Sequence, residues 1–232
     1  IRPCGEIRQV LEKGRIIRDE NGKPTSMIGA VLDITELNQS EEKLKKLAHY
    51  DEITQLPNRV LCREEIERRI VYALFKNKKF AILYIGLDNF KNINDTQGHL
   101  VGDEFIHDLA QKLLTIIPED MFLARLGGDE FIVITDYLDN EEALKVKATS
   151  FAKTLVSSTA IKKCYENITI DITTSIGIAL YPSHGDSFTS LLTSAAKAMY
   201  QVKNTGKNNY AMYHADIELR KFRELKLISD MR

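Results

Sequence analysis

Arg125-Leu126-Gly127-Gly128-Asp129-Glu130-Phe131 is the stretch from which the fold can be worked out. Apolar runs stand on both sides of it, Phe122-Leu123-Ala124 before and Phe131-Ile132-Val133-Ile134 after. Adjacent glycines accept the positive φ angles of a tight turn at no steric cost. The stretch therefore predicts a β-hairpin that presents Asp129 and Glu130 at the start of its second strand.

The two carboxylates after the glycines stand beside a turn that a ligand can approach closely. Glycine has no side chain to keep a bulky ligand away from the backbone, and carboxylates at such a place suit Mg²⁺ and phosphate chemistry. A solvated turn is the plainer alternative, and it is the better interpretation of such a turn taken alone. The other motifs of the chain favour the ligand-binding interpretation.

The composition fits one large domain, or one domain with a fragment of another. The 232 residues carry a formal net charge of −1, which gives no support for bulk attraction to nucleic acid or to a membrane surface. The cysteines Cys4, Cys62 and Cys164 are scattered without metal-ligand spacing, so a reducing, cytoplasmic location is expected. No apolar run spans a bilayer and no signal peptide is visible. Because the chain starts at Ile1 without methionine, we expect it to be a piece of a longer protein.

The first 48 residues predict a β-ribbon followed by a helix. Strand-like segments at 7–17 and 26–34 flank a strong turn at 19–24. Two strands alone are marginal in water, so residues 1–35 must pack on something; they resemble the last two strands of a PAS sensory domain, with an ordinary N-terminal hairpin as the alternative. Residues 36–48 predict a linker helix, either one strand of a two-stranded coil or a solvated helix.

The remainder of the chain alternates between helical and extended patterns. The apolar run from Phe80 to Leu87 predicts a buried central strand. A polar loop is expected at 88–95, a long strand at 168–180 and a short strand at 210–213. One helix is expected to end near residue 76 and another to begin near residue 99, and three more are expected at 141–158, 188–204 and 215–232. Helices that alternate with strands, some of them hairpins, predict an α/β (α+β) fold with helices on a mostly antiparallel sheet.

Several motifs stand in an order that resembles the GGDEF family of diguanylate cyclase domains, over residues 49–214. The motifs are Asp51-Glu52-Ile53-Thr54 with Leu56-Pro57-Asn58-Arg59, Asp88-Asn89-Phe90-Lys91 with Asn94-Asp95, Gly98-His99 with Gly102-Asp103, the stretch from Gly127 to Phe131, Ser175-Ile176-Gly177, and Ala198-Met199-Tyr200 with Lys203. One such motif is weak evidence, whereas the ordered set is specific. The resemblance implies a nucleotide-cyclase-like sheet with a β-α-β-β-α-β core.

The resemblance also implies an activity in bacterial second-messenger signalling. Members of the family condense two GTP molecules into cyclic di-GMP and pyrophosphate, and each subunit of an antiparallel homodimer holds one GTP. Mg²⁺ or Mn²⁺ neutralises phosphate charge and helps to activate the attacking hydroxyl. The reacting groups must also be held in line, which is why two subunits meet face to face. No nucleic-acid polymer and no membrane within these residues is implied.

Five residues that precede the hairpin match family positions that bind the nucleotide's base and phosphates. Asn94 and Asp103 match the guanine-binding pair, since an amide both donates and accepts and a carboxylate accepts from guanine N–H groups. The backbone N–H groups of Asn89, Phe90 and Lys91 match the loop that cradles phosphate. The plainer alternatives are a loop-capping role for Asn94 and a favourable helix-start charge for Asp103.

The remaining matched positions surround the hairpin. Lys203 matches the lysine of the terminal phosphate, and Lys207 stands where an arginine is common, so that it keeps the charge and loses the bidentate geometry; a solvated helix end is the alternative for both. Gly128 leaves room for the nucleotide. Asp129 matches a metal ligand, and Glu130 matches the acid that assists metal binding or deprotonation, so both are candidate catalytic residues.

One departure from the family pattern affects the expected metal site. The family usually has a second metal carboxylate two residues before Asp88, and here that residue is Gly86. The remaining metal ligands are Asp129, Glu130 and the Leu87 backbone carbonyl, and Mg²⁺ is often held by one or two carboxylates with phosphates and water. A slow cyclase is therefore expected. The alternatives are a degenerate GTP-binding domain that regulates an attached cyclic di-GMP phosphodiesterase, and a structural spacer.

Three further segments complete the expectations. The positions of the family's Arg-x-x-Asp inhibitory site read Pro118-Glu119-Asp120-Met121, so the product is not expected to bind there. Arg125 is expected to be a surface ion-pair residue. The charged segment 215–232 resembles a connector into an EAL phosphodiesterase domain, which implies a PAS–GGDEF–EAL parent protein with these domains as intramolecular partners.

Overall fold

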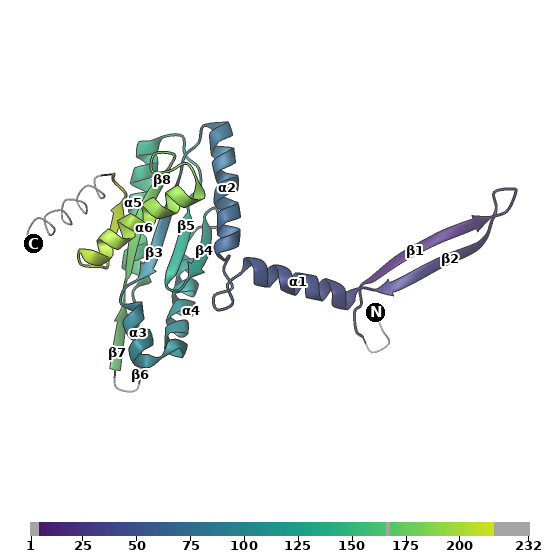
Figure 1. The fold of residues 1–232 in the computed structure, drawn as a ribbon, viewed down its shortest axis with the longest axis horizontal. Coiled ribbons are helices and arrows are strands. Elements are labelled where there is room, and N and C mark those ends of the chain that lie inside the picture. Colours follow the sequence, from purple (N-terminus) through teal and green to yellow (C-terminus); the bar gives the residue numbers. More distant parts are fainter. Residues whose placement is uncertain (1–4, 166–167, 216–232) are drawn as a thin grey trace, which may run out of the picture. The chain divides into compact units, whose positions relative to one another are not determined.

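A computed structural model describes residues 5–165 and 168–215 of the chain. It divides into two compact units, Ile1–Ala48 and His49–Arg232, whose helices and strands are labelled in Figure 1. The expected connector helix at 215–232 lies, beyond residue 215, outside the described residues.

The first unit is a β-ribbon with a helix after it. Strands β1 (Val10–Arg18) and β2 (Pro24–Asp33) pair antiparallel, and α1 (Thr35–His49) follows and runs to the boundary between the units. In the turn, Asp19 Oδ1 accepts the backbone N–H groups of Asn21 at 3.0 Å and Lys23 at 2.9 Å, which is the local chemistry that favours a turn. The structure thus has the ribbon and the helix that the sequence predicts, and their assignment to a PAS domain stays a prediction.

The second unit is built on a five-stranded sheet with the order β4-β5-β3-β8-β9. Its strands are β3 (Phe80–Leu87), β4 (Phe122–Gly127), β5 (Glu130–Ile134), β8 (Thr174–Tyr181) and β9 (Tyr210–Met212). All neighbours pair antiparallel except β8 and β9, which are parallel. Every residue of the central strand β3 is buried, as its continuous apolar sequence predicts.

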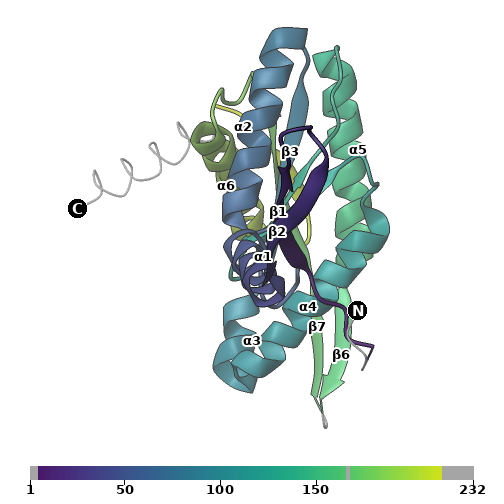
Figure 2. The same ribbon diagram turned by 90° about the vertical axis from the view of Figure 1, so that its right-hand side faces the viewer.

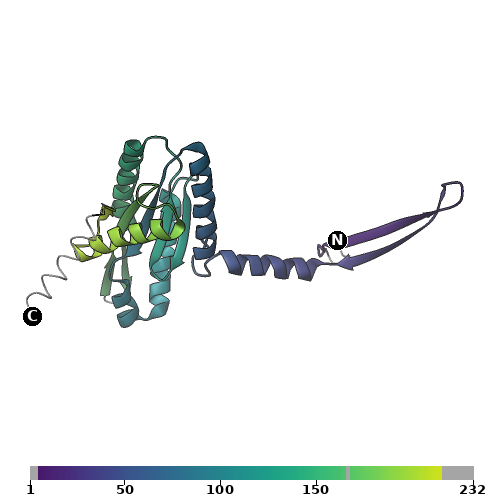
Figure 3. The same cartoon turned by 45° about the horizontal axis from the view of Figure 1, so that its top comes forward.

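Helices cover both faces of this sheet. The helices α2 (Arg59–Lys76) and α6 (Phe188–Asn204) pack on one face, against Phe80 and Ile82 of β3. The helices α4 (His99–Ile116) and α5 (Glu141–Thr159) pack on the other, against Leu83 and Ile85. Figure 2 shows α2 and α6 on one side of β3 and α5 on the other, and Figure 3 shows α6 crossing the strands.

The expected cyclase-like architecture is confirmed. The order β3-α4-β4-β5-α5-β8 is the β-α-β-β-α-β core, and alternate residues of β3 face the two helical layers because side chains of a strand point alternately to its two faces. Gly86, near the C-terminal end of β3, is paired with Glu130, the first residue of β5. The candidate site lies at this end of the two strands.

Two secondary-structure predictions were wrong in part. The expected loop at 88–95 contains a helix, α3 (Phe90–Gln97), which buries Ile93. The expected strand at 168–180 is divided into β7 (Ile168–Ile172) and β8, and β7 forms a separate hairpin with β6 (Ile161–Tyr165). The division falls at Thr173, whose carbonyl accepts the N–H of Asp88 and whose hydroxyl donates to the Asp88 carboxylate at 2.6 Å.

Candidate functional site

The Gly-Gly turn joins β4 to β5 as the sequence predicts. Gly127 and Gly128 have φ angles of 132° and 54°, in the region that favours glycine because it has no Cβ. The turn brings Glu130 opposite Gly86 of β3. The N–H of Leu87 donates to the Asp129 carbonyl at 3.3 Å, so the three expected metal ligands lie on adjoining strand ends.

Lys203, in the last turn of α6, reaches into this group of strand ends. Its Nζ donates to Asp129 Oδ2 at 2.9 Å, and the side chains of Lys203 and Asp129 are 22% and 26% exposed. A Cβ placed on Gly86 would lie 2.8 Å from the same Nζ. The predicted phosphate-binding lysine therefore lies beside the predicted catalytic carboxylates.

The expected phosphate cradle is the start of α3. Asn89 adopts a left-handed conformation with φ of 60° and makes no capping hydrogen bond to the first turn in the described residues. Its Oδ1 instead accepts from Lys207 Nζ at 2.6 Å. The first N–H groups of a helix carry partial positive charge and bind anions. The N–H groups at Asn89, Phe90 and Lys91 and the Lys207 ammonium are thus brought together, as the sequence predicts.

The two expected guanine-binding residues belong to neighbouring helices, α3 and α4. Asn94 Oδ1 is buried and has no hydrogen-bond partner within the described residues. A Cβ on Gly102 would collide with this oxygen, so glycine at 102 is what lets the amide lie against the first turn of α4, next to Asp103. A buried polar atom without a partner is rare, and a ligand that donates a hydrogen bond would satisfy it.

The donor set fits one nucleotide-borne metal ion and does not fit a protein-held pair. Asp88 is 2% exposed and accepts from Ser175 Oγ at 2.7 Å, Thr173 Oγ1 at 2.6 Å and the Asn208 N–H at 3.0 Å, so both of its carboxylate oxygens already accept hydrogen bonds. Among the described residues, no three His, Cys, Asp or Glu side chains are placed to hold a metal ion. Asp129 and Glu130 suffice for Mg²⁺ only where phosphates and water complete its octahedral shell.

Tyr84 is a residue of the site that the motif analysis did not identify. Burial raises the pKa of its phenol, and a hydrogen bond to the Glu130 carboxylate raises it further. Tyr84 is two residues before Gly86 on β3, so both point to the face of the sheet covered by α2 and α6. Because residues 84 and 86 of a strand face the same side, the alternation along this strand could have identified Tyr84 from the sequence. The neutral phenol holds Glu130 in place.

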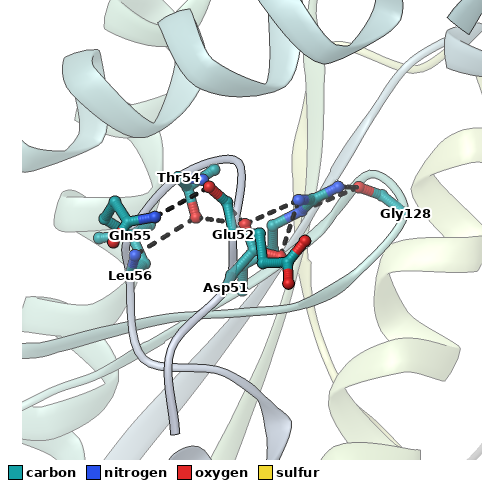
Figure 4. A network of polar contacts seen from close by, with 7 residues as sticks. Asp51, Glu52, Thr54, Gln55, Leu56 and Gly128 are labelled. Atoms are coloured by element: carbon teal, nitrogen blue, oxygen red, sulfur yellow. Dashed lines mark hydrogen bonds and ion pairs between the residues drawn. The ribbon is translucent and has the colours of Figure 1, made fainter. Parts of the chain in front are cut away.

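A second ion pair fixes the other side of the Gly-Gly turn. Arg125 Nη1 donates to both carboxylate oxygens of Asp51, at 2.8 and 2.9 Å, and its Nη2 and Nε donate to the Gly128 carbonyl at 2.8 and 3.2 Å. Figure 4 shows how the Asp51 segment approaches Gly128. The expectation of an ion pair is confirmed, but the expected surface position is wrong, since Arg125 is 6% exposed. Its planar guanidinium bridges two chain segments, which requires burial between them.

The segment around Asp51 is itself held by hydrogen bonds. Asp51 Oδ1 accepts from the Thr54 N–H at 2.9 Å and the Thr54 hydroxyl at 2.7 Å, and Gln55 Nε2 donates to the Glu52 carbonyl at 2.8 Å. Burial alone would raise the pKa of Asp51, but the hydrogen bonds from Arg125 and Thr54 and the positive charge of Arg125 hold it below its ordinary value. The first family motif is thus a brace for the turn.

Among the helices that the structure describes, none is both long enough and apolar enough to cross a bilayer.

Comparison with known proteins points to one family. The family model "Diguanylate cyclase, GGDEF domain" matches residues 48–209. The chain is 33% identical over 232 residues to "Cyclic di-GMP phosphodiesterase PdeR" of Escherichia coli, covering 99% of this chain and 34% of that protein. It is 32% identical over 198 residues to "Bifunctional diguanylate cyclase/cyclic di-GMP phosphodiesterase MucR" of Pseudomonas aeruginosa, covering 85% of this chain and 28% of that protein. The chain thus spans about a third of the length of these relatives.

A solved structure supports the same comparison. The GGDEF domain of TpbB (YfiN) from Pseudomonas aeruginosa superposes with a TM-score of 0.67 and 32% identity, covering 75% of this chain and 99% of that one.

Proposed function

Given that the chain belongs to the GGDEF family of diguanylate cyclase domains, we propose that it binds GTP and condenses two GTP molecules slowly into cyclic di-GMP. One observation carries the proposal. Two carboxylates, two lysines and the uncapped start of a helix converge at one end of the central strands. They come from the turn before β5 and its first residue, from α6 and the loop after it, and from α3. Such a group of charges suits a nucleoside triphosphate better than a neutral ligand.

The phosphates of GTP would be held by the cationic part of the site. The first N–H groups of α3 and the ammonium groups of Lys203 and Lys207 supply donors for the phosphate oxygens, and the paired contacts to Asp129 and Asn89 hold these lysines in place. Gly128 leaves space for the nucleotide next to the turn. At the other end, the Asn94 amide would donate and accept hydrogen bonds with guanine, and the Asp103 carboxylate would accept them from its N–H groups.

The carboxylates would serve the reaction itself. The 3′-hydroxyl of each GTP attacks the α-phosphorus of the other. In each attack an O3′–P bond forms, the bond from that phosphorus to the bridging oxygen breaks, and one pyrophosphate leaves, so that two GTP give cyclic di-GMP and two pyrophosphates. Glu130, held by Tyr84, would take the proton of the attacking hydroxyl as a general base. Asp129, Glu130 and the Leu87 carbonyl would face a Mg²⁺ or Mn²⁺ ion that GTP brings with it, and such an ion would supply charge neutralisation for the phosphates. A homodimer is needed because each site holds one of the two reacting nucleotides.

Gly86 favours a second candidate function. The site lacks a carboxylate at this position, and Asp88 cannot replace it because its oxygens accept three hydrogen bonds. A domain that binds GTP and turns it over poorly would instead regulate an attached cyclic di-GMP phosphodiesterase, provided GTP binds two states of the protein with different affinity. The similarity to a relative named as a phosphodiesterase supports this alternative.

The test is GTP turnover with Mg²⁺ and with Mn²⁺, with products separated by chromatography and GTP binding followed in the same samples. Cyclic di-GMP that disappears with Glu130→Gln, which keeps the shape of the side chain and removes its charge, would support the cyclase. Saturable GTP binding without product would favour the regulatory domain, and Gly86→Asp would then test whether activity can be restored. Absence of both binding and product would overturn both proposals.

A further inference from the structure

The space beside Gly86 is filled by an ammonium group of this chain. A Cβ on Gly86 would lie 2.8 Å from Lys203 Nζ and 3.0 Å from Met199 Sδ, both on α6. Gly86 is paired with Glu130 of β5 on one side and with Ser175 of β8 on the other, so this space lies over the middle one of three neighbouring strands. Lys203 is anchored there by its 2.9 Å contact with Asp129.

Two lysines stand against the two carboxylates that follow the Gly-Gly turn. Asp129 and Glu130 contribute two negative charges, and Lys203 and Lys207 contribute two positive charges, each lysine with a polar partner at the site. A carboxylate at position 86 would add a further negative charge to this group. Excess negative charge a few ångströms from a triphosphate opposes its binding unless a cation compensates it.

From this arrangement we propose that Lys203 is the resident cation of the nucleotide site, so that GTP binds here without a metal ion held by the protein. An ammonium is a compact charge with three donors, and Lys203 uses only its contact with Asp129 among those found here. It can therefore keep Asp129 while donating to a phosphate oxygen. The proposal rests on the proposed function, since it concerns how that same site holds GTP.

The test measures GTP binding to the whole 232-residue chain by isothermal titration calorimetry, once with excess Mg²⁺ and once with EDTA. We expect the two dissociation constants to agree within about threefold, which is under 1 kcal/mol. Lys203→Met keeps the length of the side chain and removes its charge, and it should weaken GTP binding in EDTA by about ten- to a hundredfold, the usual effect of losing a hydrogen bond to a charged group. Lys153→Met is the matched control, since Lys153 is exposed on α5, on the opposite face of the sheet.

Two substitutions at Gly86 separate steric from electrostatic effects. Gly86→Ala adds a Cβ that only the flexible end of Lys203 and the Met199 sulfur must accommodate, and GTP binding in EDTA should change by less than about threefold. Gly86→Asp adds the same Cβ and a negative charge, so GTP binding should become dependent on Mg²⁺, with a loss in EDTA of about tenfold or more.

The outcomes distinguish this inference from the proposed function. GTP binding in EDTA that depends on Lys203 supports both. GTP binding that needs Mg²⁺ in the unsubstituted chain, or that Lys203→Met leaves unchanged in EDTA, overturns the inference and leaves GTP binding intact. If GTP binds under neither condition while circular dichroism shows a folded chain, the proposed function fails as well.

Discussion

The same Gly-Gly turn is flanked by two aspartate–cation pairs that differ in burial and geometry. On one side Arg125 grips Asp51 through both carboxylate oxygens, and their side chains are 7% and 19% exposed. On the other side Lys203 meets a single oxygen of Asp129, and both side chains are more than a fifth exposed. A buried guanidinium that bridges a carboxylate and a backbone carbonyl fixes geometry, whereas a partly solvated ammonium can exchange partners.

The comparison shows how one turn serves two purposes. The brace between Arg125, Asp51 and the Gly128 carbonyl sets the position of the backbone. The pair between Lys203 and Asp129 leaves its charges accessible to a ligand. Substitution of Arg125 should therefore lower mainly the stability of the protein, and substitution of Lys203 should weaken mainly the binding of the ligand.

The largest effect on stability is expected for Arg125→Met. The substitution leaves the Asp51 carboxylate without its main partner and the Gly128 carbonyl without two donors. Breaking one partner of a buried pair costs about 3 kcal/mol or more, to be measured as the free energy of unfolding in urea. The control is Lys78→Met, which breaks the exposed pair with Asp139 and should cost about 1 kcal/mol or less. If the two variants lose the same free energy of unfolding, the contacts of Arg125 do not stabilise the Gly-Gly turn.

The next effect concerns pH and Asp51. Because the folded-state pKa of Asp51 is depressed, its contribution to stability is fully present above the unfolded pKa of about 3.9 and is lost as pH falls through the folded value. Asp51→Asn should destabilise the protein by about 1–3 kcal/mol at pH 7. The gap between the two proteins should then narrow below about pH 4.

Urea unfolding of both proteins at a series of pH values measures this gap. Thr54→Val provides a second, weaker perturbation, because it removes only the hydroxyl that donates to Asp51 at 2.7 Å. If the difference in the free energy of unfolding between Asp51→Asn and the unsubstituted protein stays constant from neutral pH to below pH 4, the folded-state pKa of Asp51 is not depressed.

A small effect on stability is expected for Lys203→Met. Ion pairs with this much solvent exposure contribute about 0–1 kcal/mol, so the urea midpoint should hardly move while GTP binding suffers. A loss of stability as large as that of Arg125→Met would remove the distinction between the two sides of the turn, and would make Lys203 a structural residue.

Much of this arrangement could be predicted from local sequence, and the failures have a common cause. The bounds of β3 and α6 follow from an unbroken apolar run and from a serine cap with a reciprocal Ser187–Ser190 contact. The break at Thr173 was missed because Asp88, 85 residues away, makes it. The burial of Arg125 was missed because its partner Asp51 is 74 residues away. Periodicity reports on neighbours in the sequence and carries no information about such long-range polar contacts.

The placement of Lys203 beside Gly86 is of the same kind. The family resemblance predicts that Lys203 contacts phosphate and that Gly86 removes a metal ligand, but it treats the two as separate. Only the packing of α6 across β3 shows that the lysine fills the space that the missing side chain leaves. The departure from the family pattern is therefore matched by a positive charge at the same place.

The smallest effect is expected at the remote feedback position. Residues 118–121 lie between α4 and β4, and Pro118 and Met121 line an open groove of about 770 Å³ with Val146 and Phe151. This lining suits apolar contact, and Lys147 beside it is paired with Asp136 at 2.7 Å. Among the described residues that line this groove, none is an arginine that could form bidentate contacts with the two phosphates of cyclic di-GMP.

We therefore expect Asp120→Ala to leave the response to cyclic di-GMP unchanged, both in calorimetric titration and in product inhibition of GTP turnover. Any cyclic di-GMP that binds should compete with GTP and should be weakened by Asp103→Asn, because both ligands present guanine to the same carboxylate. Tight binding of cyclic di-GMP that Asp120→Ala abolishes and excess GTP does not displace would place a feedback site next to this groove after all. In that case residues other than the arginine of the family's inhibitory site would bind the two phosphates, and Lys147 would be the first residue to substitute.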